Sequence, residues 1–302
     1  MPAELIFVAG PTAVGKSEVA PLLAEKVGGE IISVDSMQVY RGMDIGTAKP
    51  SLAERERVPH HLIDILDISE PFDAAQFVRH AQAAVDQIRG RGQRPIFCGG
   101  TGLYFKAFLE GLGEAPPADA ELRRTLEKTP PAELLEELKA LDPKTFERID
   151  RKNLRRVVRA VEVIRLTGKP FSRQRATWKK NKAPGVLVGL RRSGDDLRER
   201  IDIRVDAMFR AGLVAETEQL LKRGLGANKV AMQALGYRQV IEHLEGKRNL
   251  AGTIELVKIR TRQFAKRQMT WFRHQLPMSW IEIGRGESAN QVAENIGKSA
   301  FA

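Results

Sequence analysis

The sequence predicts an α/β fold in which helices cover a parallel β-sheet and a separate all-helical subdomain is inserted into the chain. Apolar runs alternate with helical patterns over roughly the first hundred residues, which is typical of parallel sheets. The segment Gly10-Pro11-Thr12-Ala13-Val14-Gly15-Lys16-Ser17 follows the first apolar run and fits the phosphate-loop pattern, so the core is predicted to be P-loop NTPase-like. Breaks rich in proline and glycine occur at residues 115–117 and 183–185. We therefore expect residues 1–114 and 184–302 to form the core and residues 115–183 to form the helical insertion.

Five short apolar runs are the expected strands of the sheet. They are Leu5–Ala9, Glu30–Val34, Leu62–Leu66, Pro95–Cys98 and Gly185–Leu190. Helical periodicity marks Ala74–Ile88, and helices are expected from Asp195 to the end of the chain. Residues beyond about 284 are polar, and we expect them to be peripheral.

The phosphate loop predicts binding of a diphosphate or a triphosphate, without selecting ATP. Such a loop turns backbone N–H groups toward one point at a helix N-terminus, where the helix dipole also attracts an anion. Lys16 is expected to neutralise phosphate oxygens, and the Ser17 hydroxyl is expected to ligate Mg²⁺.

Two other expected strands end on candidate functional residues. Asp35 follows the second strand, and the carboxyl ends of parallel strands are where ligands bind in such sheets. Its carboxylate can cap a turn, ligate Mg²⁺ or act as a general base, and the residues alone leave these roles open. Thr101 follows the fourth strand within a glycine-rich turn, where its hydroxyl can cap the next helix or contact a ligand.

Two further candidate residues are arginines in the helical region expected after the last strand. Arg200 and Arg204 are four residues apart, so they share a helix face and could clamp a departing phosphate. The alternative is that they pair with nearby acids, namely Asp196, Asp202 or Asp206.

The positive charge is concentrated in the expected insertion. The chain has a net charge of +11, and residues 148–182 contain thirteen Lys and Arg but only two acids. Apolar residues recur at helical spacing between Leu154 and Ile164, which leaves Arg155, Arg156 and Arg159 mainly on other faces. A second stretch, residues 258–273, holds six Lys and Arg and no acid. This imbalance predicts contact with a nucleic acid.

Several function classes are disfavoured. The single cysteine, Cys98, excludes an internal disulfide and a cysteine-rich zinc module, and it is expected to be a buried small hydrophobe. The adjacent His60 and His61 make a poor metal site. No apolar run is long enough to span a membrane and no signal peptide is visible, so a cytoplasmic location is expected. The guanine-recognition motif of GTPases is missing.

An ordered set of motifs resembles one enzyme family, the tRNA dimethylallyltransferases, also called tRNA isopentenyltransferases. The motifs comprise residues 10–17, Asp-Ser-Met-Gln-Val-Tyr at 35–40, Gly-Met-Asp-Ile-Gly-Thr-Ala-Lys-Pro at 42–50, Pro-His-His-Leu at 59–62, Gly-Gly-Thr-Gly-Leu-Tyr at 99–104, residues 153–163, Gly-Tyr-Arg-Gln at 236–239 and residues 262–271. The resemblance covers residue 5 to about residue 281 and matches the shorter bacterial form, because the cysteines of a zinc finger are missing.

The resemblance implies a transferase that moves a dimethylallyl group from dimethylallyl diphosphate to the exocyclic amine of the adenine 3′ of the tRNA anticodon. The phosphate loop then holds the diphosphate of the prenyl donor, with Mg²⁺. By family match, Asp35 is the base for the adenine amine, whereas Thr101 and Arg204 donate to diphosphate oxygens.

The family match also implies contacts with the tRNA anticodon stem-loop. The implied residues are Asp35, Ser36, Met37, Gln38, Thr101, Arg123, Arg159, Ala160, Val161, Glu162, Val163, Gly236, Tyr237, Arg238 and Gln239, to which the charge pattern adds Arg155 and Arg156. Tyr237 or Trp178 could stack on a flipped-out base, or either could be core. A monomer is expected. A kinase acting on a small molecule and a non-catalytic RNA-binding protein are the alternatives.

Overall fold

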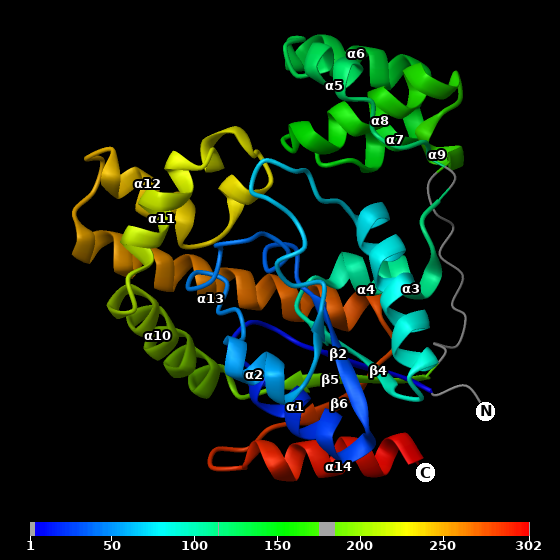
Figure 1. The fold of residues 1–302 in the computed structure, drawn as a ribbon. Helices are drawn as coiled ribbons and strands as arrows, with labels where there is room; N and C mark the ends of the chain where they lie inside the picture. The colour runs from blue at the N-terminus through cyan, green and yellow to red at the C-terminus, as the bar shows by residue number, and fades with distance from the viewer. Residues whose placement is uncertain (1–3, 114, 175–184, 302) are drawn as a thin grey trace. The chain divides into compact units, whose positions relative to one another are not determined.

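The computed structural model describes residues 4–113, 115–174 and 185–301, and the chain divides into two compact units (Figure 1). One unit comprises Met1–Leu109 and Lys182–Ala302, and the other comprises Glu110–Asn181. The expected insertion, residues 115–183, overlaps the second unit. Each unit has a hydrophobic core of its own.

The first unit is built on a six-stranded, all-parallel sheet with the order β3-β2-β4-β1-β5-β6. The strands are β1 (Leu5–Ala9), β2 (Gly29–Val34), β3 (His60–His61), β4 (Arg94–Gly99), β5 (Gly185–Arg191) and β6 (Ser279–Glu282). The predicted α/β class with a parallel sheet is therefore confirmed. Because β1, β2 and β4 are neighbours in one parallel sheet, their carboxyl ends lie together at one edge.

Two strand predictions were wrong. The third strand is His60–His61 instead of Leu62–Leu66, because Leu62 and Asp64 adopt positive φ angles of 63° and 56°, which extended strands do not allow. The edge strand β6 lies in a region that we expected to be helical throughout. It is only four residues long, so its sequence carries little strand periodicity.

Alternate residues of β1 enter two different cores. Phe7 packs on the face covered by α3 (Ala74–Gly90), α4 (Gly102–Glu110) and the end of α13 (Leu250–Gln275). Ile6 and Val8 pack on the opposite face, against α1 (Lys16–Val27) and α14 (Ala289–Phe301), which run together in Figure 1. The sheet is thus buried on both faces, as the continuous apolar strands require.

The C-terminal segment is part of the core, which corrects the expectation that it is peripheral. Val292, Ala293 and Ile296 of α14 are fully buried against the side chains of α1. Three apolar residues on one helix face are enough for this packing, and the polar residues between them conceal the pattern in the sequence. Cys98 is half-buried beside the same core, not fully buried as expected.

The remaining α-helices of the first unit lie before β3 and after β5. They are α2 (Leu52–Arg57), which precedes β3, and then α10 (Gly194–Arg210), α11 (Leu213–Lys222) and α12 (Tyr237–Leu244). Ile201 and Val205 of α10 pack against Val257 and Ala265 of the long helix α13. This packing fixes α10 and α13, which carry site residues described below.

The second unit consists of helices with a small core. Its helices are α5 (Ala120–Leu126), α6 (Pro131–Leu141), α7 (Pro143–Arg148), α8 (Leu154–Thr167) and α9 (Phe171–Gln174). Leu134 and Leu138 of α6 pack against Val157 and Val161 of α8. The apolar face predicted for the basic helix is thus the core of this unit.

Candidate active site

The phosphate loop joins β1 to α1 in the geometry that an anion-binding loop needs. Gly10 has no room for a side chain, because a Cβ would lie 2.8 Å from the Leu190 carbonyl of β5. Gly15 has a φ of 112°, a left-handed conformation that favours glycine, and it caps the N-terminus of α1. Among the described residues, the N–H groups of Lys16 and Ser17 at the start of α1 have no acceptor, so they remain for an anion.

Three cationic side chains donate hydrogen bonds to the carbonyls of this loop. The Lys16 ammonium donates to the carbonyls of Gly10 at 3.0 Å and Pro11 at 2.8 Å. Arg200 donates from Nε to the Ala13 carbonyl at 3.0 Å, and Arg192 does the same to the Val14 carbonyl at 2.8 Å. With the carbonyls engaged in this way, the loop can turn its N–H groups toward a ligand.

The Lys16 ammonium lies in a strongly desolvated place. Its pKa is lowered to about 8, mainly by burial and also by the nearby Arg204 guanidinium, while Cys98 and Asp35 oppose the shift. A bound anion would favour the charged form of Lys16 and raise this pKa. Ser17 follows it and is exposed at the first turn of α1.

Asp35 follows β2 and caps the turn that comes next. Its Oδ1 accepts hydrogen bonds from the backbone N–H of Met37 at 2.8 Å and of Gln38 at 3.3 Å. Within the described residues, no hydrogen bond reaches its Oδ2. The negative charge of Asp35 opposes the lowering of the pKa of both Lys16 and Arg204, so the three groups interact electrostatically.

Thr101 lies between β4 and α4. Its backbone N–H donates to the Val34 carbonyl at 3.2 Å, next to Asp35. In the described part of the chain its hydroxyl makes no hydrogen bond, so it does not serve as a side-chain cap. Gly99 is needed beneath it, because a Cβ there would lie 2.1 Å from the Val34 carbonyl. The turns that carry Asp35 and Thr101 therefore lie side by side.

Arg204 of α10 is not neutralised by the acids that we considered as alternatives. Those acids have other partners: Asp196 pairs with Arg192 at 2.8 Å, Asp202 with Arg262 at 2.5 Å and Asp206 with Lys258 at 2.8 Å. Arg204 forms no ion pair with any described residue, and it reaches only the Thr47 carbonyl, at 3.5 Å. Burial lowers its pKa, and Asp35 opposes that shift. Arg200 instead pairs with Glu18.

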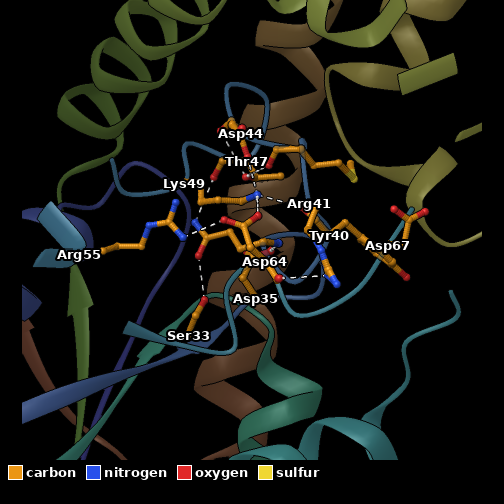
Figure 2. Close-up of polar contacts among 12 residues, drawn as sticks. Ser33, Asp35, Tyr40, Arg41, Asp44, Thr47, Lys49, Arg55, Asp64 and Asp67 are labelled. Carbon is orange, nitrogen blue, oxygen red and sulfur yellow. Dashed lines mark hydrogen bonds and ion pairs between the residues drawn. The ribbon is translucent and has the colours of Figure 1, made fainter. Parts of the chain in front are cut away.

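An ion-pair network centred on the buried side chain of Lys49 holds the long loop after β2 (Figure 2). The Lys49 ammonium donates to the Tyr40 carbonyl at 2.9 Å and pairs with Asp44 and Asp64, both at 2.5 Å. Arg55 adds a second cation on Asp64, at 2.8 Å. The Lys49 side chain is 2% exposed, so this network fixes the loop that begins with Asp35.

Gln38 connects the start of this loop to its end. Its Oε1 accepts from the Ser33 hydroxyl at 2.8 Å, and its Nε2 donates to the carbonyls of Thr47 and Ala48 at 3.3 and 3.4 Å. Gln38, Ser36 and Met37 are each half-buried. The amide of Gln38 therefore has a structural function, because it joins the two ends of this loop.

For Tyr237 the sequence left two alternatives, stacking on a flipped-out base or packing in the core, and the structure places it in the core. It is fully buried, its hydroxyl donates to Glu216 at 2.6 Å, and a Cβ on Gly46 would lie 2.4 Å from its ring. Gly236 and Gln239 are buried as well, and Gln239 Oε1 accepts from the Gly236 N–H at 3.0 Å. Arg238 alone of these four residues is exposed. The other stacking candidate, Trp178, lies outside the described residues.

The sequence analysis missed two residues that organise the site. Glu216 of α11 accepts the backbone N–H groups of residues 44–46 at 2.8 to 3.2 Å. Gln268 of α13 accepts from the Thr12 N–H and donates to the Gly100 carbonyl, both at 2.9 Å. The only signal in the sequence was the glycine content of two motifs, residues 42–50 and 99–104. Glycine leaves room for the side chains of Glu216 and Gln268 to approach.

In the second unit, the expected RNA-contacting residues divide into surface and interior. Glu162 is fully buried and accepts from Arg123 at 2.6 Å, Arg159 at 2.7 Å and the Asp119 N–H at 3.0 Å. Ala160, Val161 and Val163 are also fully buried, whereas Arg155 and Arg156 are exposed. The predicted outer basic face of α8 thus comprises Arg155 and Arg156, while Arg159 belongs to the ion-pair network of Glu162.

The described residues contain no group of three His, Cys, Asp or Glu side chains that could hold a metal ion. His61 bonds to Glu30 at 2.7 Å, and His60 bonds to the Val58 carbonyl at 2.7 Å. Within the same residues, no helix is long and apolar enough to cross a lipid bilayer.

Comparison with known proteins gives one consistent result. The family model described as IPP transferase matches residues 38–275. The tRNA dimethylallyltransferase 1 of Trichlorobacter lovleyi is 46% identical over 287 residues, which cover 93% of this chain and 94% of that protein. The tRNA dimethylallyltransferase of Geobacillus thermodenitrificans is 45% identical over 302 residues, with 98% and 96% coverage.

Two solved structures are similar over nearly the whole chain. The full-length tRNA isopentenylpyrophosphate transferase of Bacillus halodurans is 39% identical with a TM-score of 0.73, and the match covers 99% of this chain and 96% of that one. A eukaryotic dimethylallyltransferase acting on tRNA is 29% identical with a TM-score of 0.82, and the match covers 98% of this chain and 80% of that one.

Proposed function

This chain belongs to the IPP transferase family, and from that membership we propose that it is a tRNA dimethylallyltransferase. It transfers the dimethylallyl group of dimethylallyl diphosphate to the exocyclic amine of the adenine 3′ of the tRNA anticodon and releases diphosphate. The observation that carries this proposal is the edge of the sheet where β1, β2 and β4 end, because it unites the phosphate loop, Asp35 and Thr101.

The donor diphosphate binds at the phosphate loop. The backbone N–H groups at the start of α1, the Lys16 ammonium and the Thr101 hydroxyl supply hydrogen bonds to its oxygens. Arg204 adds a guanidinium that forms no ion pair with any described residue. Charge grows on the diphosphate as the C–O bond to the prenyl group breaks, and fixed donors of this kind stabilise it most in the transition state.

Mg²⁺ is proposed to bind together with the diphosphate. A magnesium ion commonly uses one or two protein ligands, with phosphate oxygens and water completing its octahedron. The exposed hydroxyl of Ser17 beside the phosphate loop fits this pattern, and it is the ligand that we assign. When bound, the ion neutralises charge on the leaving group.

Asp35 is proposed to be the general base. The adenine nitrogen forms a bond to C1 of the dimethylallyl group, and the C1–O bond breaks with its electron pair going to the diphosphate. The amine proton goes to the Asp35 carboxylate, whose Oδ2 accepts no hydrogen bond from a described residue. Its Oδ1 meanwhile holds the turn at Met37 and so fixes the direction of the carboxylate.

RNA binding is assigned to exposed cations on both units. Arg155 and Arg156 lie on the surface of α8, and Arg238 lies on the surface of α12. Lys266 and Arg267 are exposed on α13. Contacts between such cations and phosphates supply affinity without reading the base sequence.

The test is incubation with radiolabelled dimethylallyl diphosphate, tRNA and Mg²⁺, with and without ATP. We expect label in the tRNA and no dependence on ATP. Turnover of ATP without label in RNA would indicate a kinase instead. Binding of tRNA that survives Lys16→Ala without any product would indicate a non-catalytic RNA-binding protein.

A further inference from the structure

The side chain of Gln268 connects two backbone segments of the site that are far apart in the sequence. Its amide Oε1 accepts from the N–H of Thr12 in the phosphate loop, and its amide Nε2 donates to the carbonyl of Gly100 in the glycine-rich turn, both at 2.9 Å. Gln268 is nine-tenths buried. We infer that Gln268 is a positioning residue that sets the phosphate loop against the Gly100–Thr101 turn, so that both can contact one diphosphate.

The chemistry of the bridge is specific to an amide. One end of the side chain must accept a hydrogen bond and the other end must donate one. A leucine would leave a backbone N–H and a carbonyl without their partners in a mostly buried place. Ionised glutamate would keep the bond to Thr12 but would direct a negative charge at the Gly100 carbonyl.

The helix that carries Gln268 is held directly against the turn. A Cβ on Gly100 would lie 2.5 Å from Gln268 Nε2, and a Cβ on Gly102 would lie 2.2 Å from the Trp271 ring. Gln268 and Trp271 are three residues apart, so they lie on one face of α13. These two contacts explain why the turn has glycine at both positions, and they place the Gln268 amide with little freedom.

The bridge also limits which donors the phosphate loop can offer. Because the Thr12 N–H is engaged by Gln268, it is not available to the ligand. The anion must therefore bind to the N–H groups nearer the start of α1. On the other side, the bond to Gly100 fixes the residue just before Thr101, whose hydroxyl is proposed to contact the same diphosphate.

This inference rests on the proposed function, but it can be tested separately by titrating the whole protein with inorganic diphosphate and Mg²⁺ in a calorimeter. We expect Gln268→Leu to weaken diphosphate binding by about tenfold, as the loss of two buried hydrogen bonds suggests. The affinity for tRNA should stay within about twofold of the unaltered protein, and KM for the prenyl donor should rise more than kcat falls. Gln82→Leu, at an exposed position of α3, is the matched control.

Gln268→Glu adds a second measurement, the pH dependence of diphosphate affinity, which would not change if Gln268 had a merely structural role. At neutral pH its carboxylate should weaken diphosphate binding. As the pH falls, the protonated carboxyl regains one donor and one acceptor, so its affinity should approach that of the unaltered protein measured at the same pH. A ratio of affinities that does not change with pH would contradict the inference.

Gly100→Ala tests the same bridge from the other side, because its methyl group would displace the Gln268 amide. If the bridge positions the two segments, the effects of Gly100→Ala and Gln268→Leu on diphosphate affinity are strongly non-additive in the double variant. Additive losses, or wild-type diphosphate affinity in Gln268→Leu, would overturn the inference even if prenyl transfer is active. An unaltered protein that makes no product would instead overturn the proposed function, and the calorimetry would still decide the role of Gln268.

Discussion

The backbone N–H of Thr101 donates to the carbonyl of Val34 at 3.2 Å, which joins the end of β4 to the end of β2. Since Asp35 follows Val34 directly, this one bond places Asp35, the proposed base, beside Thr101, whose hydroxyl is proposed to donate a hydrogen bond to the diphosphate. The prenyl carbon must lie between the leaving diphosphate and the attacking amine. Asp35 and Thr101 follow neighbouring strands and lie one strand spacing apart. This spacing allows the amine to be held by Asp35 and the diphosphate by Thr101, with the prenyl carbon between them.

Asp35→Asn separates the two functions of this carboxylate. The amide oxygen can still accept from the N–H groups of Met37 and Gln38, so the turn should stay intact. The base is lost, and we expect kcat to fall by about a hundredfold or more with tRNA affinity unchanged. Single-turnover rates and filter binding provide the measurement. Turnover at the unaltered rate would remove Asp35 from the chemical step.

Binding of diphosphate should depend on pH through Lys16, whose pKa in the free protein is about 8. A bound anion raises this pKa, so below about 8 the ammonium is already charged and affinity is steady. Above it, binding must take up a proton, and affinity should fall by up to about tenfold per pH unit. Calorimetry in buffers of different ionisation enthalpy measures the uptake.

Lys16→Arg is the control for that experiment, because a guanidinium stays charged throughout this range. Subtracting the pH dependence of diphosphate affinity measured for this variant removes the contribution from titration of the diphosphate itself. If the two proteins showed identical proton uptake above pH 8, Lys16 would not be the titrating group.

Tyr237→Phe should lower stability, because Glu216 loses the hydroxyl that donates to it at 2.6 Å. Glu216 also receives the N–H groups of residues 44–46, so the loop after β2 should loosen with it. We expect a loss of about 1–2 kcal/mol in the free energy of unfolding, measured by urea denaturation. Val240→Ala on the same helix is the comparison for a simple loss of packing. A variant as stable as the unaltered protein would show that the hydroxyl contributes little.

Local patterns predicted the parts of the site that depend on consecutive residues. The phosphate loop is of this kind because a strand, a turn and the start of a helix lie within a few positions of one another, and Asp35 is of this kind because it directly follows a strand. Gln268 could not be predicted, since it lies 256 residues from the Thr12 N–H that it binds. Glu216 is similar, with its partners Asp44, Ile45 and Gly46 lying about 170 residues away. Charge counting also failed to separate Arg159 from its neighbours, because the fully buried carboxylate of Glu162 became visible only in the fold.

Arg155 and Arg156 should contribute to RNA affinity, whereas Arg159 should contribute to the stability of its own unit. Changing Arg155 and Arg156 together to Ala should weaken tRNA binding and reduce the slope of log K against log salt by up to about two. Arg159→Ala should instead destabilise the helical unit, because buried Glu162 loses one of its two cations. Arg79→Ala combined with Lys298→Ala removes two exposed charges elsewhere and is the matched control. An equal salt slope for the first pair and the control would argue against α8 as the RNA surface.

Arg204 is the most direct test of the donor site, because its guanidinium has no carboxylate partner among the described residues and lies within the electrostatic reach of Lys16 and Asp35. Lys16 and Arg204 are two cations beside one acid, Asp35, so one positive charge is left over, and a diphosphate would supply the missing negative charge. Arg204→Ala should therefore raise KM for the prenyl donor and lower kcat, while tRNA affinity stays the same. Arg204→Lys keeps the charge but loses the bidentate geometry, so it should recover diphosphate binding more than it recovers kcat. A defect confined to tRNA affinity would show that Arg204 contacts the RNA and not the diphosphate.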